Sequence, residues 1–242
     1  MSLNGGMTYI HNQISKMNNI IKQKQTQLEC LFQFISDNKK SKFEEFIQYR
    51  TKYLTVVLED IFQSQNASAV LRTCDCVGVQ DVHIIENRND YTLNPEVDLG
   101  AAKWLNLKKY NQDDFNTINA FNDLKKQGYR IIATTPHKHD QLLTDLKLDG
   151  KMALVFGTEK EGLSEQAIEA ADEFVRIPMH GFTESFNISV SAAICLFHIM
   201  NKVRNSEINW MLTEEERLDT LIDWAKSVVK NSDGILKQLN LT

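Results

Sequence analysis

Three short segments of the sequence carry polar side chains in patterns that suit the binding of a charged substrate and the transfer of a chemical group. In the first segment, Asn66 and Arg72 stand six residues apart. A guanidinium keeps its charge at neutral pH and presents several donors in a planar fork. Arg72 therefore suits a phosphate contact and the stabilisation of an oxygen that becomes negative better than it suits the role of a base. Asn66 could orient such a group, or it could simply cap a helix.

The second segment predicts a tight turn that carries a carboxylate. Gly157, Glu159 and Gly162 follow the apolar residues 152–156, which have the pattern of a buried strand. Glycine permits backbone conformations that other residues avoid, so both glycines could also serve a turn that binds nothing. Ser164 could cap the helix that comes next.

The third segment joins the end of a strand to the start of a helix. Ile177-Pro178-Met179 closes a short strand, and Ser185, Phe186 and Asn187 lead into an apolar helix. In open α/β sheets, ligands bind where the strands end. Each of these residues could by itself be a cap, a turn residue or a surface residue, but the three segments in this order predict one site.

These segments need a framework in which strands and helices alternate. Short apolar runs bounded by turn residues predict strands, and apolar residues at helical spacing predict helices. The expected strands cover 55–61, 81–86, 129–135, 152–156 and 174–178, and the expected helices cover 66–77, 113–127, 164–173 and 187–205. Such alternation is typical of an α/β fold with a mostly parallel sheet.

Helical segments flank this framework. Apolar residues from Ile10 to Ile35 recur at steps of three, four or seven, as on one face of a helix. Ser41 to Glu44 forms a capping-box pattern before a second helix that ends near Arg50, and Thr213 to Glu216 forms another before a helix that reaches about Lys230. We therefore expect a helical N-terminal extension (1–53), an α/β domain (54–206) and a helical C-terminal extension (207–242).

Composition excludes several other classes of protein. With 42% hydrophobic and 24% charged residues among 242, the chain has an ordinary globular composition. Its longest apolar run, residues 192–200, is shorter than the roughly 20 residues of a membrane span. No signal-peptide pattern opens the sequence, so we expect a cytoplasmic protein with reduced cysteines. The P-loop and G-x-G-x-x-G fingerprints of nucleotide sites are absent.

The sequence predicts no metal site. Cys74 and Cys76 are two residues apart on an expected helix and so do not share a face. His137 and His139 flank Lys138 in an expected loop, where solvated histidines are the simpler interpretation.

Charge is spread unevenly along the chain. The net charge is −5, but the first 54 residues carry eight Lys or Arg against four Asp or Glu, whereas residues 55–201 carry 13 against 21. A basic N-terminal segment can attract a polyanion such as RNA. It can equally be the solvated surface of a helix, and charge alone favours that interpretation.

In their order and spacing, the three segments resemble the motifs of the SpoU/TrmH family of SPOUT-class RNA 2′-O-methyltransferases. Asn66 and Arg72 match the first motif, and the turn from Gly157 to Gly162 matches the second. The segment 177–189 matches the third, with Phe186 in place of the usual leucine. The resemblance covers about residues 50–206. It implies a deep C-terminal trefoil knot, S-adenosyl-L-methionine as the methyl donor, and a homodimer in which both copies complete the active site.

Within this family, the sequence looks like the tRNA guanosine 2′-O-methyltransferases that act in the D-loop, which carry helical extensions. The resemblance thus implies tRNA as the partner. The alternatives are a ribosomal RNA 2′-O-methyltransferase of the same family, a SPOUT enzyme that methylates a base nitrogen, and a non-catalytic RNA-binding homologue. An unrelated α/β protein is the alternative outside the family.

The resemblance also implies roles for individual residues. The reaction would be an in-line attack of a ribose 2′-hydroxyl on the sulfonium methyl, so the enzyme chiefly positions the two groups. The implied catalytic set is Arg72, Asn66, Glu159, Ser185 and Asn187. The implied cofactor-binding set is Thr134, Gly157, Ile177, Met179 and Phe186. The candidates for contacts with the tRNA backbone are the basic residues Lys39, Lys40, Lys42, Arg50 and Lys52.

Overall fold

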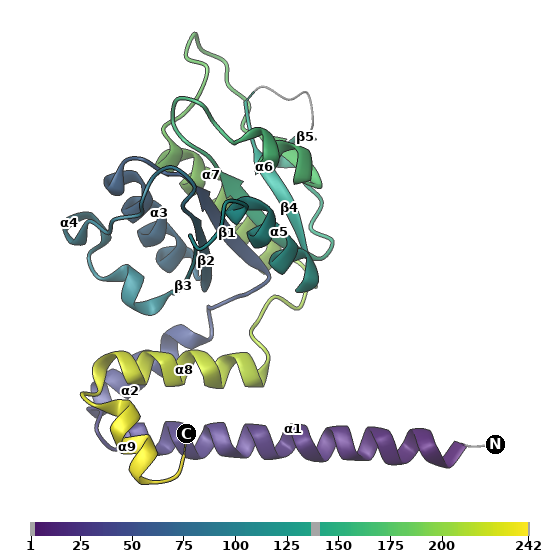
Figure 1. The fold of residues 1–242 in the computed structure, drawn as a ribbon, viewed down its shortest axis with the longest axis vertical. Coiled ribbons are helices and arrows are strands. Elements are labelled where there is room, and N and C mark those ends of the chain that lie inside the picture. Colours follow the sequence, from purple (N-terminus) through teal and green to yellow (C-terminus); the bar gives the residue numbers. More distant parts are fainter. Residues whose placement is uncertain (1–2, 137–140, 242) are drawn as a thin grey trace. The chain divides into compact units, whose positions relative to one another are not determined.

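The computed structural model describes residues 3–136 and 141–241, with side chains from residue 15 onward. The chain divides into two compact units. Residues 50–211 form one unit, and residues 1–49 together with 212–242 form the other. Within the described residues, the first unit contains all the strands and the second consists of helices (Figure 1).

The α/β unit is built on one sheet of seven strands, in the order β3-β2-β1-β6-β4-β7-β5. Every strand pairing in the described part of the chain is parallel, which confirms the expected mostly parallel α/β sheet. The strands are β1 (Leu54–Glu59), β2 (Asp81–Ile85), β3 (Asn106–Tyr110), β4 (Tyr129–Thr134), β5 (Gln141–Leu142), β6 (Lys151–Phe156) and β7 (Glu173–Arg176). Because parallel strands run in one direction, their carboxyl ends meet at one edge of the sheet.

Helices cover both faces of this sheet, so the middle of each central strand is apolar. One face packs against α3 (Ser64–Val77) and α7 (Ile188–Arg204), and the other packs against α5 (Asn116–Lys126) and α6 (Glu165–Ala170). Neighbouring side chains of β1 divide between the two cores, with Val56 in the first and Val57 in the second, and both are fully buried. A strand buried on both faces reads as a continuous apolar run, which is why β1, β4 and β6 are predictable.

The short connecting elements are α4 (Pro95–Asp98) and two 3-10 turns, η1 (Ala101–Trp104) and η2 (Leu143–Asp145). The two predicted helix caps before α6 and α7 are confirmed. The hydroxyl of Ser164 accepts a hydrogen bond from the backbone N–H of Ala167 at 3.1 Å, and Oδ1 of Asn187 accepts one from that of Ser189 at 2.9 Å.

Asn66 is not a helix cap. Helix α3 begins at Ser64, with Gln63 at the N-cap position, so Asn66 lies in the first turn of the helix. Asn66 is buried, at 8% exposure. Its side chain makes hydrogen bonds with Gln63, Glu159 and Asn187 instead.

The second unit consists of α1 (Leu3–Phe32), α2 (Asp37–Ile47), α8 (Glu214–Val228) and α9 (Ser232–Gln238). Lys24 of α1 pairs with Glu215 at 2.8 Å and with Asp219 at 2.7 Å on α8. The rings of Phe43 and Trp224 lie 5.4 Å apart in the core of this unit. No helix in the described part of the chain is both long and apolar enough to cross a membrane.

The two expected capping boxes have different outcomes. Thr213 and Glu216 form one at the start of α8, where the Thr213 N–H donates to Glu216 Oε2 at 2.8 Å. The expected start at Ser41 is wrong, because α2 begins at Asp37 and the Ser36 carbonyl accepts from the amides of Lys39 and Lys40. Ser41 therefore lies inside the helix.

Candidate functional site

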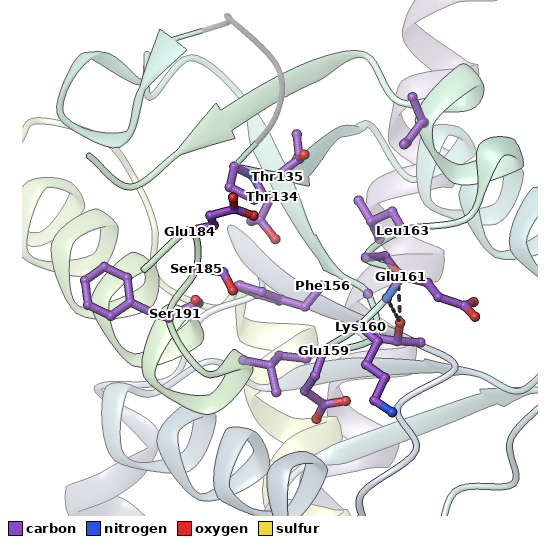
Figure 2. Close-up of a pocket in the computed structure, with 17 residues that line it drawn as sticks. Thr134, Thr135, Phe156, Glu159, Lys160, Glu161, Leu163, Glu184, Ser185 and Ser191 are labelled. Atoms are coloured by element: carbon purple, nitrogen blue, oxygen red, sulfur yellow. Dashed lines mark hydrogen bonds between the residues drawn. The ribbon is translucent and has the colours of Figure 1, made fainter. Parts of the chain in front are cut away.

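A cavity at the carboxyl edge of the sheet has a volume of about 390 Å³ (Figure 2). The ends of β4 and β6 open into it, and so do the segments before α6 and α7. Figure 2 shows Glu184 and Ser185, from the segment before α7, across the cavity from Glu159 and Lys160, which follow β6. The position agrees with the rule that ligands bind at strand ends in α/β sheets.

A smaller cavity of about 70 Å³ adjoins the first. The two share six lining residues, namely Thr134, Thr135, Pro136, Ser185, Phe186 and Ser191. All five residues of the expected cofactor-binding set line one cavity or the other: Gly157 lines the larger, Ile177 and Met179 the smaller, and Thr134 and Phe186 both. The expected set is thus assembled at one place, from three strand ends.

The turn after β6 is closed by its own backbone. Thr158 and Gly162 exchange hydrogen bonds, from Thr158 N to Gly162 O at 2.9 Å and from Gly162 N to Thr158 O at 3.1 Å. Gly162 has φ +72, a conformation that favours glycine. A Cβ on Gly157 would lie 2.2 Å from the carbonyl oxygen of Gly162, so the turn closes only if residue 157 lacks a side chain.

Three of the expected catalytic residues form one hydrogen-bonded network. The amide of Asn66 donates to the carboxylate of Glu159, and Asn187 Nδ2 donates to Asn66 Oδ1 at 3.3 Å. Asn66 also donates to Gln63 Oε1 at 3.1 Å. The network joins helix α3, the turn after β6 and the start of α7, which are the places of the three sequence motifs.

Arg72 lies apart from this network. Six residues along a helix turn a side chain about 120° away from that of Asn66. Arg72 is exposed, lines neither cavity, and makes no hydrogen bond or ion pair with any residue that the structure describes. Ser185, in contrast, lines both cavities.

The larger cavity has an acidic rim. Its charged lining residues are Glu159, Glu161, Glu184 and Lys160, so carboxylates outnumber ammonium groups. In the smaller cavity, burial raises the pKa of the Cys195 thiol to about 12, so this thiol is neutral at physiological pH and acts as an apolar wall. The larger cavity therefore suits a positively charged group, whereas the smaller one combines apolar walls with the guanidinium of Arg176.

Several lining residues were absent from the sequence-based set. They are Thr135, Pro136, Lys160, Glu184, Ser191 and Arg176, and each lies at a strand end or next to a motif residue. Arg176 lines the smaller cavity with its Nε buried and without a hydrogen-bond partner in the described residues. In the sequence, these residues are marked only by their positions after β4, β6 and β7. Such a position does not distinguish a side chain that lines a cavity from its neighbours.

The basic candidates differ in exposure. Lys42 is exposed, Lys39 and Lys40 are half-buried on α2, and Lys40 pairs with Asp37 at 3.0 Å. Arg50 is only 6% exposed and its guanidinium pairs with Asp75. Because this leaves Arg50 almost no surface for a phosphate, its expected role in RNA contact does not fit the structure.

Lys52, in the same set, is about one-fifth exposed and lies 3.7 Å from Asp81. Among the residues that the structure describes, no cluster of three or more His, Cys, Asp or Glu side chains has the arrangement of a metal site. His137 and His139 lie outside the described residues.

Comparisons with known proteins give consistent matches. Residues 53–197 match the model of the SpoU rRNA Methylase family. The chain is 46% identical over 210 residues to a tRNA (guanosine(18)-2′-O)-methyltransferase of Borreliella burgdorferi, which covers 87% of this chain and 94% of that protein. It is 32% identical over 197 residues to a tRNA (guanosine(18)-2′-O)-methyltransferase of Thermus thermophilus, which covers 79% and 97%.

The fold is also similar to a solved structure. The TrmH/SpoU tRNA modifying enzyme of A. aeolicus superposes with a TM-score of 0.71 at 27% identity, over 80% of this chain and 98% of that one. The family match over residues 53–197 includes all three motif segments and the lining residues of both cavities.

Proposed function

The chain belongs to the SpoU rRNA methylase family, and from this premise we propose that it transfers a methyl group from S-adenosyl-L-methionine to the ribose 2′-hydroxyl of a guanosine in the D-loop of tRNA. The observation that carries the proposal is the joining of the three motif segments beside one cavity: Asn66 donates to Glu159, which lines the cavity, and accepts from Asn187. The two relatives named above, both tRNA (guanosine(18)-2′-O)-methyltransferases, support the choice of tRNA and of guanosine.

The cavity residues fit this methyl donor. A volume of about 390 Å³ lies in the usual range of small-molecule sites. The donor carries a sulfonium and an ammonium group, which suit the acidic rim formed by Glu159, Glu161 and Glu184. Its adenosine part suits the apolar walls formed by Ile177 and Phe186. When bound, it supplies a methyl group that the sulfonium charge has already activated.

The protein then has to hold the ribose hydroxyl in line with that methyl group. Ser185 lines both cavities, so its hydroxyl can donate a hydrogen bond to a phosphate or to the ribose. Asn66 holds Glu159, and thereby the turn after β6, in one arrangement, and Asn187 donates to Asn66. Arg72 clamps a phosphate of the RNA and stabilises the negative charge that develops on the 2′ oxygen.

Because Arg72 lines neither cavity of its own chain, we propose that it serves the site of a second copy in a homodimer. Apolar side chains that the single chain leaves exposed support this assembly. On α7, Val190 is 44% and Phe197 is 69% exposed, and α7 packs against α3, the helix that carries Arg72. Two copies that meet on these helices would bury the apolar surface and bring each Arg72 to a neighbouring cavity.

Two further features belong to the same proposal. The C-terminal part of the α/β unit, from β6 through α7, is proposed to thread as a trefoil knot, as the family resemblance implies. The strand order β6-β4-β7-β5 supports this, because no strand there lies beside its neighbour in sequence. The proposed substrate also places the chain in the cytoplasm.

The test is methyl transfer from labelled S-adenosyl-L-methionine to unmodified tRNA transcripts and to ribosomal RNA, with the product mapped to a nucleotide by nuclease digestion and mass spectrometry. We expect label on a D-loop guanosine ribose. Label on ribosomal RNA alone would keep the chemistry and contradict the substrate, and label on a base would contradict ribose chemistry. Cofactor binding without transfer to either RNA would favour a non-catalytic RNA-binding protein.

A further inference from the structure

Glu59, the last residue of β1, is a buried carboxylate that joins three elements of the α/β unit. Its side chain is only 2% exposed. Oε1 accepts hydrogen bonds from the hydroxyls of Thr117 at 2.6 Å and Ser164 at 2.8 Å, and Oε2 accepts one from the backbone N–H of Ser164 at 2.9 Å. Thr117 belongs to α5 and Ser164 precedes α6, so one carboxylate holds both helices to the end of β1. Hydrogen bonds to a charged acceptor are stronger than those between neutral groups.

Ser164 ends the segment that lines the larger cavity. The lining residues run without a break from Phe156 to Leu163, and Ser164 comes next. The start of this segment is fixed by β6 in the sheet. The turn inside it is closed by the Thr158–Gly162 hydrogen bonds and so moves as one body. The position of the turn therefore depends on where its far end, Ser164, is held.

A second contact to the same segment is weaker. Asp60 Oδ1 accepts hydrogen bonds from the backbone amides of Asn87 at 2.7 Å and Arg88 at 2.9 Å, and Arg88 reaches Glu161 at 2.7 Å. The Arg88–Glu161 pair is exposed, with side chains at 56% and 67%. Exposed ion pairs contribute little because water and salt screen them. The buried contact between Glu59 and Ser164 thus fixes the far end of the segment, whereas the hydrogen bond from Asn66 to Glu159 holds its middle.

We propose that Glu59 is a positioning residue for the methyl donor: through Ser164, it holds the turn from Gly157 to Gly162 in the form that binds S-adenosyl-L-methionine. This inference rests on the proposed function, because the turn lines the same cavity. Glu59 does not line the cavity and acts on the turn through Ser164.

The Glu59→Gln variant tests this role in the full chain. The amide oxygen can still accept from the backbone N–H of Ser164, which leaves the NH2 group facing the hydroxyls of Thr117 and Ser164. Both hydroxyls already accept a hydrogen bond, from Asn87 and Ala167, so their own O–H groups lose an acceptor and the remaining bond loses the carboxylate charge. We expect the Kd for S-adenosyl-L-methionine, measured by calorimetry, and its KM to rise about tenfold or more. The kcat and the KM for tRNA are expected to change little, since the residues around the ribose remain in place.

Glu86→Gln is the matched control. Glu86 is a buried carboxylate at 8% exposure just after β2, and it accepts hydrogen bonds from the Tyr91 amide and from the Lys109 and Asn111 side chains. It does not touch the segment around the cavity. We expect this variant to lose stability, seen as a lower Tm, and to bind the methyl donor like the unaltered chain.

Ser164→Ala supplies a second route to the same answer. It is expected to raise the Kd by itself, and the double variant Glu59→Gln/Ser164→Ala is expected to raise it by less than the product of the single effects. The positioning role would be overturned if either Glu59→Gln or Ser164→Ala left the affinity for S-adenosyl-L-methionine unchanged. It would also be overturned if Glu59→Gln and Glu86→Gln lost equal affinity, or if the Kd of the double variant rose by the full product of the single effects. If Glu59→Gln does not fold, the Ser164→Ala affinity decides alone. Failure of the unaltered chain to bind S-adenosyl-L-methionine would instead overturn the proposed function.

Discussion

The side-chain amide of Asn66 donates a hydrogen bond to the carboxylate of Glu159, 93 residues further along the chain. This contact connects the first turn of α3 to the turn after β6. Asn187 Nδ2 adds the start of α7 by donating to the same Asn66 side chain at 3.3 Å. One asparagine, 8% exposed, thus connects all three motif segments, although its position in the sequence suggests a helix cap.

Replacement of Asn66 by alanine should therefore damage the site more than the helix. Glu159 and Asn187 both lose a partner, and the turn after β6 loses its contact with α3. We expect kcat/KM for methyl transfer to fall about tenfold to a hundredfold, as for the loss of one hydrogen bond to a charged group. Gln63→Ala is the control, because Gln63 bonds Asn66 at 3.1 Å without touching Glu159. Equal activity losses in the two variants would contradict this assignment.

Arg72→Lys should separate charge from geometry. Lysine keeps the positive charge but lacks the planar fork that binds phosphate in a bidentate manner. Since Arg72 lines neither cavity, we expect S-adenosyl-L-methionine to bind normally and turnover to fall about a hundredfold. Near-normal turnover would remove Arg72 from the proposed catalytic set.

If Arg72 serves the cavity of a second copy, two inactive variants should restore each other. Arg72→Ala and Ser185→Ala chains, unfolded and refolded together, form mixed dimers in which one of the two sites has both residues. Random pairing predicts a recovery of roughly a quarter of the normal activity. A mixture as inactive as its components would place Arg72 and Ser185 in the same chain's site.

Gly157→Ala should block the methyl donor without unfolding the chain. The new Cβ would lie 2.2 Å from the backbone oxygen of Gly162, so the turn has to open. We expect the Kd for S-adenosyl-L-methionine to rise at least about tenfold, since a cofactor site tolerates little displacement. Gly150→Ala is the control, because Gly150 has φ +85 and nothing lies within 4 Å of an added Cβ. This substitution is expected to cost about 1 kcal/mol of stability without affecting the Kd. Comparable affinities for both variants would argue against a shaped turn.

The sequence predicts the interior of the sheet well and its margin poorly. Strands β1, β4 and β6 are buried on both faces, and the mainly apolar runs in their sequences predict them. Strand β3 lies at the edge, and three of its five residues, Leu107 to Lys109, are exposed, so no apolar pattern marks it. Edge strands are held by backbone hydrogen bonds, which leave no trace in the side-chain pattern.

The site shows a similar division. Motif spacing identifies part of the cavity lining, such as Gly157, Glu159 and Ser185, because the ends of parallel strands meet at one edge. It does not identify Glu59, which reads as one polar residue at the end of an apolar strand although it accepts three hydrogen bonds. Arg50 shows the opposite case. A basic residue in a basic segment suggests an RNA contact, but burial depends on tertiary packing and places it against Asp75.

Among the basic candidates, Lys39 and Lys42 on α2 remain the best for tRNA. They stand three residues apart and so share a face of the helix. Replacing both by glutamine should weaken tRNA binding and reduce the slope of log K against log salt by about two, if each contacts one phosphate. The double variant Lys230→Gln/Lys237→Gln, exposed in the same unit, is the control of equal charge. Equal slopes for both variants would assign Lys39 and Lys42 to ordinary solvated surface.

The last prediction concerns acid stability and depends on His83. Burial is the main reason that the pKa of His83 is lowered to about 4. The positive charge of Lys108 also lowers this pKa, and the negative charge of Asp123 partly opposes the shift. The side chain is 6% exposed, and its Nδ1 lies 3.3 Å from the Tyr110 hydroxyl. The folded chain therefore keeps this imidazole neutral down to about pH 4, whereas the unfolded chain protonates it near pH 6.5.

Between these two values the unfolded state binds more protons, so the free energy of unfolding must fall as the pH falls. The loss begins near pH 6.5, reaches about 3 kcal/mol near pH 4, and then stops growing. His83→Gln should flatten the dependence over this window, measured by urea unfolding at pH 7, 5.5 and 4.5. His180→Gln, at an exposed position, should follow the unaltered chain. The prediction is contradicted if the unaltered chain, His83→Gln and His180→Gln show the same dependence of unfolding free energy on pH. Another group would then be responsible for the loss of stability in acid.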